Sequence, residues 1–175
     1  MQSSTICGLF RKCFREKFRT EIVGGASEPF YQPAVNGEDL NRVYFRADYV
    51  SSALHEIAHW CIAGIDRRQQ PDYGYWYFDD RNLEAQLAFE QSEARPQALE
   101  WIFSEASCNQ FRVSCDNFDE RVLDFDRFRV NVQFEVHRWL KEGLPRRANK
   151  FTRALLTLTG RHQALDPVTY KEPPQ

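Results

Sequence analysis

The chain has 175 residues and a net charge of −2, a length that suits a single domain, residues 1–175, with its own hydrophobic core. This charge excludes the basic field that general nucleic-acid binding needs, and no run approaches the roughly 20 apolar residues of a membrane span. Charged residues from Arg11 to Arg19 interrupt any signal-peptide core, and the five cysteines form no CxxC pair. We therefore expect a cytoplasmic protein with reduced thiols and no nucleic-acid or membrane partner.

The apolar spacing along the chain predicts a mostly helical α+β fold with a small β-sheet. A first amphipathic helix should cover about residues 6–18, where apolar side chains recur with helical spacing. Gly24, Gly25 and Pro29 then indicate turns, and residues 42–46 are typical of a short strand. This strand leads directly into the most regular helical pattern of the chain.

That helix is predicted between Tyr49 and Gly64. Its apolar positions repeat with helical spacing at Val50, Ala53, Leu54, Ile57, Ala58, Cys61 and Ile62. Asp48 stands where an N-cap residue would accept a hydrogen bond from the first turn, and Gly64 is typical of a left-handed residue that ends a helix. The apolar stripe should face a core and leave residues 55–59 on its flank.

Aromatic residues between Tyr73 and Phe78 favour a strand or an ordered loop after this helix. Residues 82–95 and 96–107 are predicted to be helical. Pro96 either starts a second helix or kinks one long helix, because proline is accepted in a first turn but disturbs a helix interior.

Two more helices should complete the chain. One covers about residues 124–142 and stops at Gly143, and the other begins with Pro145 in its first turn and ends near Gly160. The tail from about residue 165 is expected to be irregular.

The pentapeptide His55-Glu56-Ile57-Ala58-His59 carries the strongest functional signal, because this pattern is typical of metal-binding helices. On a helix the two imidazoles lie one turn apart on the same face, where they can bind one metal ion. Glu56 lies about 100° around the helix from His55, close enough to contact a metal-bound water. The alternative is a pair of surface histidines beside a solvated Glu56.

Two imidazoles need a third ligand, and the residues leave several candidates open. His137 and His162 resemble structural or solvated histidines, so a carboxylate from the helix after the aromatic run is the better choice. The carboxylate candidates are Glu84, Glu90, Glu93 and Glu100. An inward stripe is formed by Leu83, Leu87, Ala94 and Trp101. It would bury Glu90 at least as deeply as Glu93, so periodicity does not choose between them. Glu93 differs in lying just before Pro96, where a helix face can be re-aimed.

Several longer segments are more specific than the pentapeptide alone. They are Ala53–Gly64, Tyr73–Tyr77, Phe89–Glu90, Glu93, Pro96–Leu99 and Val113–Asn117. With this order and spacing, the chain resembles the bacterial elongation factor P hydroxylase family over nearly its whole length, except before about Phe30 and beyond Arg147. In that family two motif histidines and a downstream glutamate are expected to hold a metal. The resemblance places these ligands at His55, His59 and Glu93.

The resemblance further implies a metal-dependent hydroxylase domain with a zincin-like metal helix. Its substrate would be the lysine of elongation factor P that has already received a β-lysyl group, with O₂ as co-substrate. Two histidines and one carboxylate leave open positions on Fe(II), as in non-haem iron oxygenases, so iron is the expected metal and zinc the alternative. Glu56 would be a catalytic residue that orients water or moves a proton. The His-x-Asp pattern of 2-oxoglutarate-dependent enzymes is absent, which leaves dependence on 2-oxoglutarate unknown.

The same residues also suit a zinc-dependent peptidase in which Glu56 would be the general base, and only the wider resemblance favours the oxygenase. A structural zinc site is a third option, but such sites usually have four protein ligands and no cysteine here has the required partner. Asp79, Asp80 and Glu90 are candidate carboxylates of a groove for the cationic substrate arm, with a solvated surface as the alternative.

Overall fold

The computed structural model describes residues 1–35, 39–74, 83–114 and 124–174, and for residues 83–89 and 91 it describes the backbone only. Its helices are α1 (Ser3–Phe18), α2 (Val50–Ile62), α3 (Leu83–Ala106), α4 (Phe125–Glu142) and α5 (Arg146–Thr159). Its strands are β1 (Thr20–Ala26), β2 (Phe30–Gln32) and β3 (Asn41–Arg46). Short 3₁₀ helices are η1 (Arg67–Gln69), η2 (Pro71–Gly74), η3 (His162–Leu165) and η4 (Pro167–Tyr170).

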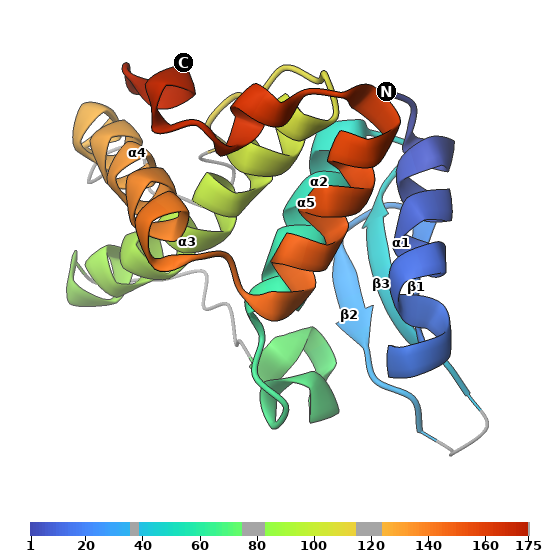
Figure 1. The fold of residues 1–175 in the computed structure, drawn as a ribbon. Coiled ribbons are helices and arrows are strands. Elements are labelled where there is room, and N and C mark those ends of the chain that lie inside the picture. Colours follow the sequence, from blue (N-terminus) through green and yellow to red (C-terminus); the bar gives the residue numbers. More distant parts are fainter. Residues whose placement is uncertain (36–38, 75–82, 115–123, 175) are drawn as a thin grey trace.

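The arrangement is mostly helical with a small sheet, so the expected α+β class is confirmed (Figure 1). The zincin-like character of the metal helix stays a prediction. Within the described residues, none of the helices combines the length and the apolar character that a bilayer crossing requires.

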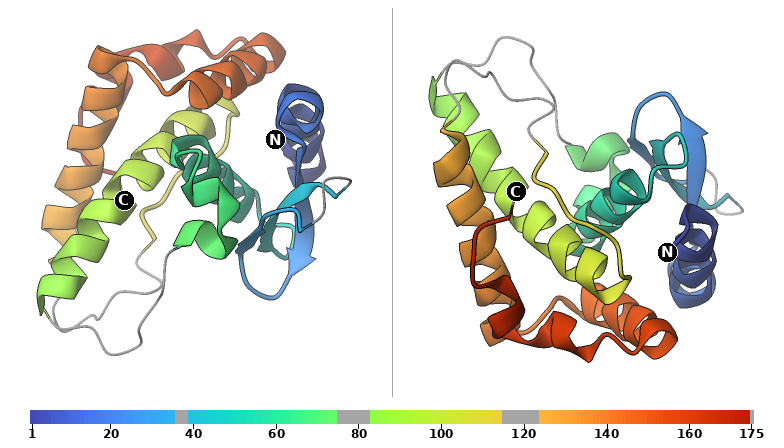
Figure 2. Two further views of the ribbon diagram at one scale, coloured as in Figure 1. Left: turned by 90° about the horizontal axis from the view of Figure 1, so that it is seen from below. Right: turned by 90° about the horizontal axis from the view of Figure 1, so that it is seen from above.

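The sheet carries the first part of the core. Its strand order is β1-β3-β2, with β1 parallel and β2 antiparallel to β3. Ile22, Val43 and Phe45 share one buried face, because alternate residues of a strand point to the same side. Helices α1 and α2 pack on this face, and α5 packs against both of them (Figures 1 and 2). The predicted first helix and the strand at 42–46 are confirmed.

Gly24 and Gly25 lie inside β1 rather than in the predicted turn. The pairing of β1 with β3 changes register between Val23 and Ala26, and Gly25 has a φ of 90°. These are the features of a β-bulge, which a glycine in the left-handed region accommodates without strain. A Cβ on Gly24 would lie 2.7 Å from the ring of Phe45, so this position needs a residue without a side chain.

A second part of the core lies between α3 and α4. Trp101 of α3 and Phe128 of α4 belong to this cluster, and Tyr170 of the C-terminal tail packs on Trp101 with ring centroids 4.8 Å apart. Helix α3 continues through Pro96, so the alternative of one long helix is correct. The predicted first residue of this helix, residue 82, and the aromatic residues 75–78 lie outside the described residues.

The ends of α4 and the C-terminal end of α5 agree with the sequence prediction, whereas Pro145 is the N-cap residue of α5 and not part of its first turn. Asp124 accepts a hydrogen bond from the first turn of α4, and Gly160 ends α5 with a φ of 71°. Beyond residue 165 the chain is more regular than expected, because residues 167–170 form η4. The reason is burial: Tyr170 is fully buried and its hydroxyl donates to the carbonyl of Ala164 at 2.9 Å.

Helix α2 does not have the predicted caps. Tyr49 rather than Asp48 occupies the N-cap position, and no side chain accepts a hydrogen bond there. The nearby Ser52 Oγ instead accepts from the backbone N–H of Arg46 at 3.0 Å, which ties the helix start to β3. At the other end the last residues are Ile62 and the C-cap Ala63, and Gly64 is not in the left-handed region.

Two arginines end α2 in place of a glycine cap. Arg147 of α5 donates to the carbonyls of Trp60 at 3.0 Å and Cys61 at 3.1 Å, and also to the carbonyl of Ala63. Arg68 donates to the same Ala63 carbonyl at 2.7 Å. Free carbonyls give a helix C-terminus partial negative charge, so the guanidinium groups stabilise it. These contacts fix the helix that carries the histidine pair.

Candidate metal centre

Helix α2 presents His55 and His59 toward α3, which contributes Glu93. The two imidazole rings lie one turn apart, with centroids 4.6 Å apart and Nε2 atoms 2.9 Å apart. Glu93 Oε2 is 3.6 Å from His55 Nε2, and Glu93 Oε1 is 3.5 Å from His59 Nε2. The structure therefore brings together the three side chains that the resemblance implied as ligands.

The spacing of these atoms suits one shared metal ion. Two ligand atoms that are each about 2.1 Å from an ion lie about 3.0 Å apart at a right angle and about 3.4 Å apart at a tetrahedral angle. The separations of 2.9, 3.5 and 3.6 Å lie close to these values, although the last two involve different oxygens of Glu93. With one ligand atom taken from each residue, the three atoms lie within 4.8 Å of one another. Imidazole nitrogen and carboxylate oxygen are ligands of both zinc and iron, so the donor set fits a metal without selecting which one.

Glu100 holds His55 from the side away from Glu93. Its Oε2 lies 2.9 Å from His55 Nδ1, and its side chain is only 5% exposed. An ionised carboxylate accepts hydrogen bonds, so Nδ1 carries a proton. Nε2 is then the nitrogen that faces the other members of the ligand group, which consists of His55, His59 and Glu93. Metal-ligating histidines usually have such a partner. Glu100 was a ligand candidate in the sequence, and the structure instead makes it the partner of a ligand candidate.

Buried charges set the protonation of this site. Burial lowers the pKa of His55, but the hydrogen bond with Glu100 and the negative charges of Glu100, Glu93 and Glu56 outweigh it and raise this pKa to about 10. Burial raises the pKa of Glu100 and of Glu56, while the charges of the two histidines act in the opposite direction. A metal ion would replace the proton on Nε2 and supply the positive charge that these carboxylates face.

Glu56 lies beside the ligand group and is not part of it. Its side chain is buried, and its charge interacts with those of His59, His55 and Glu93. Among the residues that the structure describes, none forms a hydrogen bond with its carboxylate. A buried carboxylate in this position is suited to exchange a proton with a neighbouring group. Its catalytic role stays a prediction.

Comparison with known proteins identifies the family. A family model described as elongation factor P hydroxylase matches residues 9–167. The chain belongs to this family. A curated relative from Haemophilus influenzae, named elongation factor P lysine hydroxylase, is 42% identical over 152 residues, which cover 86% of this chain and 85% of the relative. The family expected from the sequence is thus confirmed.

The other candidate ligands in this family member lie elsewhere or have other partners. Glu90 is buried and forms an ion pair with Arg127 of α4, with 2.7 Å between Oε2 and Nη2. The Nε2 atom of His137 lies 3.1 Å from the carbonyl of Tyr170, and His162 is exposed in η3. The structure supports the structural or solvated interpretation of both histidines. Outside the described side chains lie Glu84, Asp79 and Asp80.

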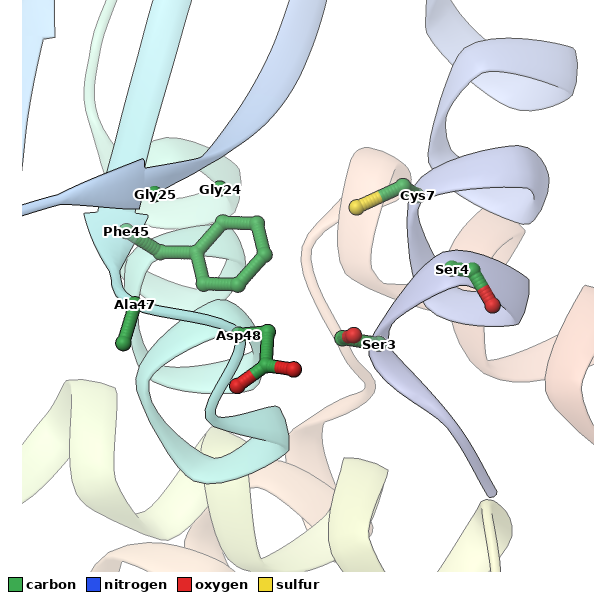
Figure 3. Close-up of a pocket in the computed structure, with 8 residues that line it drawn as sticks. All are labelled: Ser3, Ser4, Cys7, Gly24, Gly25, Phe45, Ala47 and Asp48. Carbon is green, nitrogen blue, oxygen red and sulfur yellow. The ribbon is translucent and has the colours of Figure 1, made fainter.

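A cavity of about 480 Å³ lies away from the ligand group, between the start of α1 and the ends of β1 and β3 (Figure 3). It is lined by Ser3, Ser4, Cys7, Gly24, Gly25, Phe45, Ala47 and Asp48. The ring of Phe45 extends toward α1 across this cavity. Because none of its lining residues belongs to the candidate metal centre, it plays no part in the chemistry considered for that centre.

Proposed function

We propose that this chain hydroxylates the lysine of elongation factor P that carries a β-lysyl group. The description of the family and the name of the Haemophilus influenzae relative support hydroxylation and this protein substrate. The observation that carries the proposal is the convergence of His55, His59 and Glu93, whose candidate ligand atoms all lie within 4.8 Å of one another. We propose these three side chains as the metal ligands.

Iron(II) is the proposed metal. Held by two histidines and one carboxylate, it supplies the redox chemistry by which O₂ hydroxylates an unactivated carbon. Zinc binds the same kinds of ligand but has no redox chemistry, so a zinc ion would not support the reaction after which the family is described. Three protein ligands leave coordination positions open, as an oxygenase requires.

The residues around the ligands have separate tasks in this proposal. Glu100 keeps the proton of His55 on Nδ1, so that Nε2 stays directed at the metal position. Glu56, buried beside both histidines, takes up and returns a proton during the reaction. Tyr73 lies with its ring parallel to that of His59, at a centroid distance of 6.5 Å, and excludes water from that side.

The proposed location is the cytoplasm, where a translation factor is found and thiols stay reduced. The described cysteines agree with a reducing compartment, because Cys7, Cys13, Cys61 and Cys108 are all free.

The test is an intact-mass assay on β-lysylated elongation factor P. Protein loaded with Fe(II) without oxygen is mixed with the factor, a reductant and O₂. The expected product is heavier by the mass of one oxygen atom, and protein loaded with zinc should give no such product. Cleavage of the factor by the zinc form would favour the peptidase instead, and an unchanged mass with the iron form would contradict the proposal.

A further inference from the structure

The turn η2 lies against the candidate metal centre. The ring of Tyr73 is parallel to the imidazole of His59 and stacks on Tyr31 with centroids 4.4 Å apart. Asp72 and Tyr73 have φ values of 45° and 58°, a conformation that residues other than glycine rarely adopt. The stacked rings and the contacts of η2 with β2 fix this turn beside the metal-facing side of α2.

Asp72 is anchored through one of its carboxylate oxygens. Its Oδ1 accepts a hydrogen bond from the backbone N–H of Tyr31 at 2.8 Å. The side chain is half-buried, and no described lysine or arginine forms an ion pair with it. Burial raises the pKa of Asp72, whereas the Tyr31 N–H and the charge of the nearby His59 lower it. The second oxygen, Oδ2, is left for another partner.

The other described carboxylates around the centre are buried or already have a partner. Glu93 belongs to the ligand group, Glu100 bonds a ligand imidazole, and Glu56 is buried. Glu90, which the sequence suggested as a groove carboxylate, is paired with Arg127 and is 2% exposed. Among the described side chains, Asp72 is therefore the carboxylate that is both accessible and without a cationic partner beside the centre.

We propose that Asp72 recognises an ammonium group on the side chain of the substrate. This inference rests on the proposed function, because the β-lysyl-lysine arm is cationic and a carboxylate at the edge of the centre would bind it through a charge-assisted hydrogen bond. Asp72 is then a specificity residue, which favours a cationic side chain over a neutral one. Because the hydrogen bond from Tyr31 already holds the Asp72 side chain, this side chain loses little conformational freedom when the substrate binds.

The variant Asp72→Asn tests this role, because asparagine keeps an oxygen acceptor for the Tyr31 N–H and removes the negative charge. Asp66→Asn is the matched control: Asp66 is exposed and lies on the same connection between α2 and η2. With iron-loaded protein, Asp72→Asn should raise the KM for the modified factor about tenfold and leave kcat and iron content unchanged. Asp66→Asn should behave like the wild type.

A second measurement changes the substrate in place of the protein. Acetylation of the amines on the β-lysyl arm should raise the wild-type KM to that of Asp72→Asn, and should change the variant little. Equal KM values for Asp72→Asn and Asp66→Asn would overturn the role of Asp72, as would a wild type indifferent to acetylation. A wild-type protein that hydroxylates neither form would overturn the proposed function itself, so the two failures are distinguishable.

Discussion

Replacing Glu100 by glutamine removes a charge beside His55 while keeping the hydrogen bond, because the glutamine Oε1 still accepts from Nδ1. In the wild type, burial lowers the pKa of His55 but the hydrogen bond and the carboxylate charges raise it to about 10. A proton therefore occupies Nε2 at neutral pH, and a metal ion must displace it. In Glu100→Gln the largest raising influence is weakened, so the pKa of His55 should fall.

The sign and size of the effect follow from competition between proton and metal. Below a pKa of about 10, each unit rise in pH raises the fraction of His55 that has no proton on Nε2 about tenfold. Wild-type metal affinity should therefore rise about tenfold per unit and about a hundredfold from pH 7 to pH 9. For Glu100→Gln the rise should be smaller over this range. At high pH, where no proton competes, the variant should bind about 10- to 100-fold more weakly because the support of His55 is impaired.

The assay is an anaerobic competition titration of Fe(II) against a chelator at several pH values. Glu105→Gln is the control, since Glu105 is also on α3 but pairs with Arg161 at 3.5 Å, away from the ligand group. Its pH dependence should match that of the wild type. Parallel pH profiles for the wild type and Glu100→Gln would refute the assigned role of Glu100.

Three further substitutions test residues outside the Glu100–His55 pair. Glu56→Gln should keep the metal but lower turnover about a hundredfold, measured by intact mass, and full activity would exclude Glu56 from proton transfer. Arg147→Met should lower the free energy of unfolding by about 1–3 kcal/mol in urea titrations, because carbonyls at the end of α2 lose their donor; an unchanged midpoint would show that this cap is dispensable. Glu90→Gln should lower the free energy of unfolding by only about 1–2 kcal/mol, because the Arg127 side chain is 45% exposed and water screens the ion pair. This variant should retain the metal, and loss of the metal would show that Glu90 is a ligand.

The histidine pair was predictable because its geometry is local. The i, i+4 spacing of His55 and His59 places both imidazoles on one side of any helix, and the apolar stripe showed that this segment is a helix. The same reasoning predicted α1, and helix start and stop signals predicted α4 and α5. Nothing distant in the chain is needed for these conclusions.

The choice among the α3 glutamates could not be made from periodicity. Glu90, Glu93 and Glu100 are all buried, so the pattern of burial does not separate them. Their different roles depend on what approaches from other helices: Arg127 of α4 meets Glu90, and His55 of α2 meets Glu100. The seven-residue spacing from Glu93 to Glu100 is two helical turns, a signal that both reach the same site.

The ends of α2 show the same limit. Asp48 and Gly64 match local capping preferences, yet neither caps the helix. Arg147, which is far away in the chain, donates to its last carbonyls, and a tertiary contact of this kind leaves no trace in the local sequence. The bulge at Gly25 was likewise unpredictable, because it depends on pairing with β3.

We propose that two imidazoles from α2 and one carboxylate from α3 hold a single metal ion. The most direct measurement is the Fe(II) stoichiometry of the wild type and of His55→Ala, His59→Ala and Glu93→Ala under anaerobic conditions, with circular dichroism to verify the fold. We predict one ion per chain for the wild type and loss of tight binding in each folded variant. Wild-type stoichiometry and affinity in a folded Glu93→Ala protein would contradict the assignment of Glu93 as a ligand.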